Sequence, residues 1–223
     1  MRPLSSMQKL IADHLIRFFL TTRLVLHRRF YEDRKINAVS KAVHRMHKRG
    51  LITRHELSSR FHFYRLGPNV RNYYQVPPRL LKMPGPQMEN DLAILRYCCL
   101  GPRRLDRLRP DELTEVYPDF PESELRQGWY VDPKQGALGR FVLIPSYKAV
   151  KHLVGELRSL LNQYLETSSL RSLISEGRFL FVLMTYRPEQ ARTLKEALAK
   201  EDWSLRTGFP PLTIRAHALP QED

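Results

Sequence analysis

Thiols and long apolar runs are scarce in this sequence of 223 residues. Its two cysteines, Cys98 and Cys99, are adjacent, so neither has a second thiol across the fold or a C-x-x-C partner, which excludes a disulfide framework and a cysteine zinc site. No run of about eighteen apolar residues occurs, and Lys9, Asp13 and Arg17 interrupt the N-terminal segment, unlike the apolar core of a secretory signal. We therefore expect a cytoplasmic protein with no membrane partner.

Motifs for several common chemistries are also missing. The sequence contains no G-x-S-x-G elbow, no Walker loop, no G-x-G-x-x-G motif and no cysteine with a suitable histidine and carboxylate set. His44 and His47 are spaced one helical turn apart, but no third and fourth metal ligand follow at a suitable spacing. A tyrosine nucleophile would need an accompanying histidine or arginine constellation, which is missing. The sequence thus predicts no catalytic residue, no metal site and no cofactor.

Positive charge is what the sequence has in excess, and it is concentrated in the first third. The formal net charge is +14. Residues 1–75 contain 16 Lys and Arg against 4 Asp and Glu, which leaves 21 against 19 for residues 76–223. An excess of this kind indicates a polyanionic partner, either nucleic acid or an anionic membrane surface. The location of this charge therefore tells more about the choice between a nucleic-acid and a membrane partner than its amount does.

Hydrophobic spacing predicts three helices and a hairpin in that basic third. The helices cover about residues 5–19, 22–31 and 36–49, and Gly50 stands where the third would stop. The segments LITRHEL and RFHFYRLG then alternate apolar and polar residues around the turn candidates Ser58 and Ser59, which is typical of a two-stranded hairpin. We expect a small helical domain that ends in this hairpin.

The third of these helices has two distinct faces. Val39, Val43 and Met46 share one face with Ile36, and polar or basic residues share the other. A helix fits the major groove of DNA, where short or bidentate side chains reach base edges and cations reach phosphates. The candidate DNA contacts are Asn37, Ser40, Lys41, His44, Arg45 and Lys48 on the helix, Arg34 and Lys35 before it, and Arg60, His62 and Arg65 on the hairpin. The alternative is a solvated basic face on a core helix.

Three helices followed by a hairpin, with the third helix the most basic, resemble the winged helix-turn-helix plan. The segment INAVSKAVHRMHKRGLITR is similar to the recognition helix and first wing strand common in bacterial winged-helix proteins. The resemblance implies a DNA-binding domain over residues 1–76. The segment PPRLLKMPGPQMEND, with four prolines and one glycine, follows it and predicts a linker over residues 77–90.

Residues 91–223 read as a small α/β domain with a mixed sheet, so the predicted fold class is α+β or α/β. A helix is expected at about residues 90–99, and QGWYVDP and GRFVLIPSY form a second hairpin. A long helix over residues 147–165 and a short one over residues 170–175 lead to the buried strand RFLFVLMTY. The helix RPEQARTLKEALAK and the strand LTIRAHAL end the domain.

That order resembles the restriction-endonuclease-like nuclease core, and the whole chain resembles the replication-relaxation family of bacterial and plasmid proteins. The resemblance implies an acidic residue at the first hairpin and an acid-x-Lys triplet at the end of the second strand, which together hold a metal ion. Asp119 and Asp132 are candidates for the first position, but residues 144–146 are Ile-Pro-Ser where the triplet is needed. The expected core is therefore degenerate, and turn or cap chemistry is favoured for the two aspartates.

The leading hypothesis is a double-stranded DNA-binding protein of a bacterial or mobile-element system, acting in replication, transfer, transposition or transcription control. Residues 91–223 would serve assembly, a protein partner or a homodimer. One alternative is a divergent metal-dependent nuclease or nicking enzyme built around Asp119, Asp132 and Glu156, which plasmid cleavage with Mg²⁺ or Mn²⁺ would reveal. Another is an adaptor whose winged helix binds a protein, which would show little DNA affinity at physiological salt.

Overall fold

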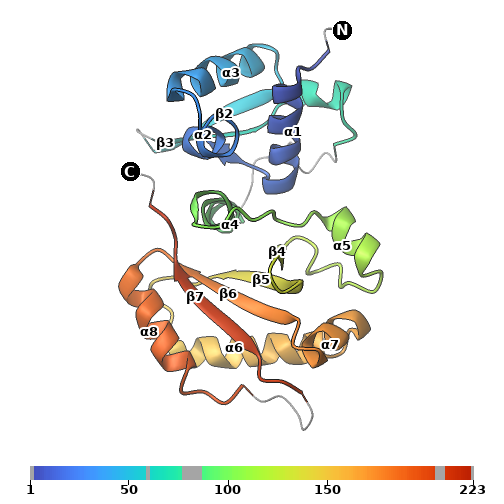
Figure 1. Ribbon diagram of the computed structural model, residues 1–223, viewed down its shortest axis with the longest axis vertical. Coiled ribbons are helices and arrows are strands. Elements are labelled where there is room, and N and C mark those ends of the chain that lie inside the picture. The colour runs from blue at the N-terminus through green and yellow to red at the C-terminus, as the bar shows by residue number, and fades with distance from the viewer. Residues whose placement is uncertain (1–2, 59–60, 77–86, 204–208, 222–223) are drawn as a thin grey trace. The chain divides into compact units, whose positions relative to one another are not determined.

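The computed structural model describes residues 3–58, 61–76, 87–203 and 209–221, and the chain divides into two compact units (Figure 1). Unit 1 comprises Met1–Arg104 with Pro220–Asp223, and unit 2 comprises Leu105–Leu219. Helices α1–α8 and two sheets make the fold a mixed α+β one, as predicted.

The division lies later in the chain than the predicted linker at residues 77–90, of which residues 77–86 lie outside the described ones. Helix α4 (Met88–Leu100) was expected to begin the second domain, but it packs on α1 (Ser6–Phe18) and α2 (Arg23–Phe30) within unit 1. Most of its side chains are buried, which requires cover on more than one side. The predicted domains 1–76 and 91–223 are corrected accordingly.

Unit 1 is a set of helices around a small antiparallel sheet. Its sheet has the order β1-β3-β2, so β3 is the central strand. The remaining elements of this unit are β1 (Thr21–Thr22), α3 (Ile36–Lys48), β2 (Ile52–Ser58), β3 (Phe61–Leu66) and the short 3₁₀ helix η1 (Pro68–Asn72). The three helices and the hairpin predicted here are all present.

Local chemistry sets the ends of these helices. The Ser5 hydroxyl accepts the backbone N–H of Gln8, and the Gln8 side-chain oxygen accepts the backbone N–H of Ser5. These two bonds form a capping box that begins α1. Thr22 caps α2 by accepting the Val25 N–H at 3.3 Å. After α3, Gly50 adopts a φ of 66°, and a Cβ there would lie 2.6 Å from the Asn69 side chain. Glycine is therefore required to end α3 at this point.

Unit 2 is a four-stranded mixed sheet with helices. The sheet order is β4-β5-β6-β7, in which β4 and β5 form an antiparallel hairpin and the other two pairings are parallel. Figure 1 shows α6, α7 and α8 on one side of the sheet. The elements are α5 (Pro110–Val116), β4 (Gly128–Asp132), β5 (Ala137–Leu143), α6 (Val150–Tyr164), α7 (Ser168–Ser175), β6 (Phe179–Thr185), α8 (Pro188–Leu198) and β7 (Thr213–Ala218).

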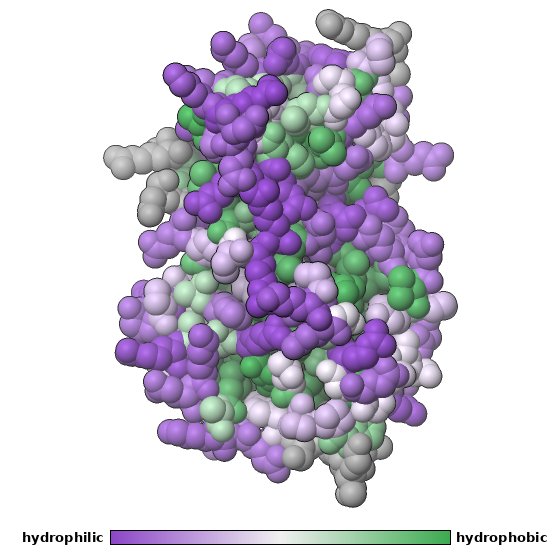
Figure 2. All heavy atoms as spheres, viewed as in Figure 1, coloured by the Kyte–Doolittle hydropathy of each residue, from purple (hydrophilic) through white to green (hydrophobic). Residues whose placement is uncertain are grey.

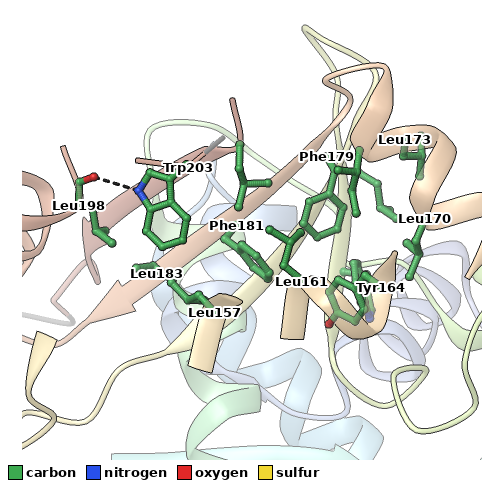
Figure 3. Close-up of a cluster of buried hydrophobic side chains, with 14 of the residues drawn as sticks. Leu157, Leu161, Tyr164, Leu170, Leu173, Phe179, Phe181, Leu183, Leu198 and Trp203 are labelled. Carbon is green, nitrogen blue, oxygen red and sulfur yellow. Dashed lines mark hydrogen bonds between the residues drawn. The ribbon is translucent and has the colours of Figure 1, made fainter. Parts of the chain in front are cut away.

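The core of unit 2 lies between the sheet and those helices. Phe179, Phe181 and Leu183 point from one face of β6 toward α6, α7 and the end of α8 (Figure 3). Trp203 belongs to the same buried cluster, and its indole N–H donates to the Leu198 carbonyl at 3.0 Å. Because both faces of β6 are buried, the strand reads as the continuous apolar run that the sequence shows.

A buried ion pair lies beside this core. The Arg140 guanidinium contacts the Glu124 carboxylate at 3.1 Å and stacks over the Trp129 ring at 5.4 Å. The Tyr164 hydroxyl donates to the same carboxylate at 2.7 Å. Burial raises the pKa of Tyr164, so this hydroxyl stays protonated and acts as a donor. The network links the loop before β4 to β5 and α6.

Three elements were not predicted. Strand β1 has two residues, too few for any periodic pattern, and α5 and η1 are similarly short. The long helix predicted from residue 147 begins at Val150 instead, and Tyr147 before it is 88% exposed. Tyr147 lies instead in a turn, in which the Lys148 N–H donates to the Pro145 carbonyl at 3.1 Å.

Candidate nucleic-acid interface

The outward face of α3 is the first part of the candidate interface. Asn37, Lys41, His44, Arg45 and Lys48 are exposed on it and Ser40 is half-buried, whereas Val39, Ala42, Val43 and Met46 are buried. Hydrophilic side chains cover α3 in Figure 2. No acidic side chain within the described ranges pairs with Lys41, Arg45 or Lys48. The predicted two-faced helix is confirmed.

The turn before α3 fixes where the helix starts. The ring of His27, at the end of α2, contacts the Arg34 carbonyl through Nε2 at 2.6 Å, so the imidazole donates there. Lys35 is the N-cap residue, and both Arg34 and Lys35 are exposed. Arg34 also lies 3.8 Å from Asp33. The two cations predicted as DNA contacts therefore stand at the N-terminal end of α3.

The structure corrects one predicted contact on the hairpin. Arg65 is only 4% exposed, so its guanidinium cannot reach a phosphate outside the protein. Burial lowers the pKa of this guanidinium, and the charge of Asp91 on α4 opposes that effect. Arg65 lies on the central strand β3, whose last four residues are all buried. Arg60, the other predicted cation of the hairpin, lies outside the described residues.

A groove opens between α3 and the hairpin, with a volume of about 580 Å³. Three predicted residues, Ser40, His44 and His62, line it. The remaining lining comes from Arg23 and Leu24 of α2, Ile36, Val43 and His47 of α3, and Arg54, Phe61 and Tyr64 of the hairpin. The groove thus brings arginine and histidine side chains together with apolar ones, all within unit 1.

Sequence reasoning missed most of this groove. Arg23 precedes the apolar part of α2, and Arg54 reads as one polar residue of an alternating strand. Their convergence depends on how the hairpin packs against α3, which periodicity does not specify. The usable signal was the concentration of histidines, six of the eight lying in residues 1–62.

Two hydrogen bonds define the chemistry of the groove. The guanidinium of Arg54 contacts Nε2 of His62 at 2.5 Å. The ring of His47 contacts the Ile52 carbonyl through Nδ1 at 3.2 Å. These bonds hold a cation and two imidazoles in place on both walls of the groove.

The acidic residues considered for a nuclease site each have a partner in the protein itself. The Asp119 carboxylate accepts the Ser169 N–H at 3.0 Å, at the start of α7. Hydrogen bonding from the Ser169 side chain, and next from its N–H, lowers the pKa of Asp119. Asp132 is buried, accepts the Lys134 N–H at 3.0 Å and pairs with Arg215 at 2.7 Å. Glu156 forms an ion pair with Lys148. Cap and turn chemistry for the two aspartates is therefore confirmed.

Within the part of the chain that the structure describes, no three His, Cys, Asp or Glu side chains are grouped so that they could hold a metal ion. The same described ranges include no helix with the length and apolar character needed to cross a bilayer. Comparison of the chain with family models, with curated proteins and with solved structures finds no match.

Proposed function

We propose that this protein binds double-stranded DNA through unit 1, with α3 as the helix that enters the major groove. The outward face of α3 carries this proposal, because it presents three cations and three other polar side chains opposite a buried apolar face. The order α1, β1, α2, α3, β2, β3 and the sheet order β1-β3-β2 resemble the winged helix-turn-helix plan, and this resemblance supports the same proposal.

The side chains of α3 divide by position. Asn37, Ser40 and Lys41 stand in its first half, where a helix entering the major groove meets base edges. Arg45 and Lys48 stand in its second half, where the cations reach phosphates. Each phosphate contact releases condensed counterions, which gives affinity for DNA of any sequence and makes it sensitive to salt. Base contacts would then add selectivity.

Unit 2 is proposed as an assembly or partner-binding domain without nuclease activity. The partners of Asp119, Asp132 and Glu156 support this, since each carboxylate already has a hydrogen bond or ion pair. The resemblance to the replication-relaxation family and the bacterial or mobile-element setting remain predictions from the sequence. Neither the nuclease nor the adaptor alternative gains a specific observation from the structure.

Single substitutions on α3 test this proposal. A preferred duplex is first selected from a random library, and fluorescence anisotropy then compares Lys41→Ala with Lys48→Ala on preferred and on random DNA. Lys41→Ala should lose about 1–3 kcal/mol on preferred DNA only, because base contacts carry sequence information. Lys48→Ala should weaken both duplexes alike, because phosphate contacts carry none.

Lys195→Ala is the matched control, since Lys195 is exposed on α8 of unit 2. It should leave affinity for both duplexes unchanged. If the three variants bind as the unaltered protein does, α3 is not the DNA-binding helix.

A further inference from the structure

We propose that the groove between α3 and the β2–β3 hairpin binds a phosphate group of the DNA backbone, and that this grip tightens as pH falls because His47 and His62 gain protons with the phosphate. The inference rests on the proposed function and names a second contact within it. It concerns a site that lies beside the outward face of α3, on residues other than Lys41, Arg45 and Lys48.

The lining of the groove suits a phosphate. Arg23 and Arg54 provide guanidinium groups, which match phosphate oxygens in geometry and charge. His44, His47 and His62 add three imidazoles. Leu24, Ile36 and Val43 also line the groove. These apolar side chains would keep water from part of a bound anion, and this strengthens charge-assisted hydrogen bonds to it.

The hydrogen bonds identify the nitrogens that take up protons. Arg54 can only donate, so Nε2 of His62 accepts its N–H and carries no proton of its own. The Ile52 carbonyl can only accept, so Nδ1 of His47 carries the proton and donates it. In both rings Nε2 is therefore the atom that is protonated when the imidazole becomes charged.

Proton uptake and phosphate binding are linked at His62. Without an anion, a proton on Nε2 would end the hydrogen bond from Arg54 and place two cations in contact, which is unfavourable. A phosphate between them would accept from the guanidinium and from the new N–H together. Each event then favours the other, because linkage between two ligands is reciprocal.

The charges around these imidazoles come from every element that borders the groove. Arg23 of α2 and Arg54 of β2 add positive charge, and His44 of α3 and Tyr64 of β3 are further titratable neighbours. Glu56 is opposite His62 in the strand register and is the acidic residue of the hairpin. Since Glu56 is exposed, its attraction for a charged His62 is weakened by solvent and salt. A bound phosphate is the stronger partner.

Duplex-DNA affinity of the full chain, measured by fluorescence anisotropy at constant ionic strength from pH 6 to pH 8, tests the inference. Imidazoles change charge in this range. We expect the unaltered protein to bind roughly tenfold more tightly at pH 6 than at pH 8, because proton uptake on binding makes affinity depend on pH. The variant His47→Gln/His62→Gln should lose most of this pH dependence and bind more weakly than the unaltered protein at pH 6.

The control is His152→Gln, an exposed histidine on α6 of unit 2, which should keep the full pH dependence. His44→Gln is a second groove variant and should lose part of it. Circular dichroism of each variant shows whether it is folded under the binding conditions.

The outcomes separate the inference from the proposed function. Binding that responds to Lys41→Ala but has no pH dependence, or that keeps its pH dependence in the double histidine variant, would overturn the inference and leave the function standing. Failure of the unaltered protein to bind duplex DNA at any pH would overturn both.

Discussion

The two units use their charged residues in opposite ways. In unit 2, ion pairs join cations to acids across the fold, as in Arg140 with Glu124, Arg215 with Asp132 and Arg158 with Glu201. On α3 of unit 1, Lys41, Arg45 and Lys48 have no acidic partner within the described ranges. Charge that is not neutralised within the protein repels itself and contributes nothing to folding. The difference supports the proposal that the cations of α3 contact an external anion.

Both units also bury polar side chains. In unit 2 the buried Arg140 forms an ion pair with the half-buried Glu124. Unit 1 buries His14, whose Nε2 contacts the Thr21 hydroxyl at 3.0 Å. Burial, with smaller contributions from Arg29 and Arg17, lowers the pKa of His14 to about 3, so the ring is neutral. The buried imidazole of unit 1 is thus uncharged, although the same unit also buries the charged side chains of Arg65 and Asp91.

The largest expected effect comes from breaking the buried pair of unit 2. Arg140→Met should lower the free energy of unfolding by about 3–5 kcal/mol, because it leaves the Glu124 carboxylate buried without its cation. Both tryptophans, Trp129 and Trp203, lie in unit 2, so urea denaturation followed by tryptophan fluorescence reports on this unit alone.

Glu201→Gln removes the exposed pair with Arg158 and is the matched control, with an expected loss of about 0–1 kcal/mol. Equal losses in the two variants would mean that burial does not distinguish these pairs.

The pH dependence of protein stability tests the buried His14 of unit 1. The folded state keeps His14 neutral while the unfolded state binds a proton below about pH 6.5, so stability falls as pH falls from that value toward 3. The slope is at most about 1.4 kcal/mol per pH unit, which amounts to roughly 2 kcal/mol at pH 5.

Urea denaturation followed by circular dichroism at pH 7 and pH 5 measures this loss. The variant His14→Gln should be less stable at pH 7, because it loses the packing of the ring against Phe18, but it should show a smaller difference between the two pH values. An unchanged difference would show that His14 is not the group responsible.

The smallest effect concerns Asp119. Asp119→Asn should lower stability by at most about 1 kcal/mol, since the carboxylate is exposed and accepts one N–H at the start of α7. Because hydrogen bonds from Ser169 lower its pKa, this contribution is present above the ordinary value of about 4 and is lost as pH falls below it.

The unaltered protein should leave supercoiled plasmid intact with Mg²⁺ or Mn²⁺. Cleavage that Asp119→Asn or Asp132→Asn abolishes would assign these residues to catalysis instead.

Periodicity predicted the elements but not how they pack. The buried and exposed faces of α3 follow directly from the helical spacing of Val39, Val43 and Met46. Alternation in β3 suggested an exposed Arg65, yet β3 is central in its sheet and both its faces are covered. The central position of β3 comes from its pairing with β1, a strand of two residues. Asp91, whose charge acts on Arg65, belongs to α4, which the sequence assigned to the second domain. Sequence patterns did not predict the groove either, because its lining residues come from α2, α3 and the hairpin, which meet only in the folded unit.

The salt dependence of duplex-DNA affinity tests the central claim most directly. Two triple variants are compared with the unaltered protein: Lys41→Ala/Arg45→Ala/Lys48→Ala on α3, and Lys151→Ala/Lys195→Ala/Lys200→Ala, which removes three exposed cations of unit 2. Each lost phosphate contact lowers the slope of log affinity against log salt by about 0.9. Since Arg45 and Lys48 are the two proposed phosphate contacts, the α3 variant should have a slope up to roughly 1.8 smaller. The unit 2 variant should keep the slope of the unaltered protein. Equal slopes in the two variants would contradict the assignment of DNA binding to α3.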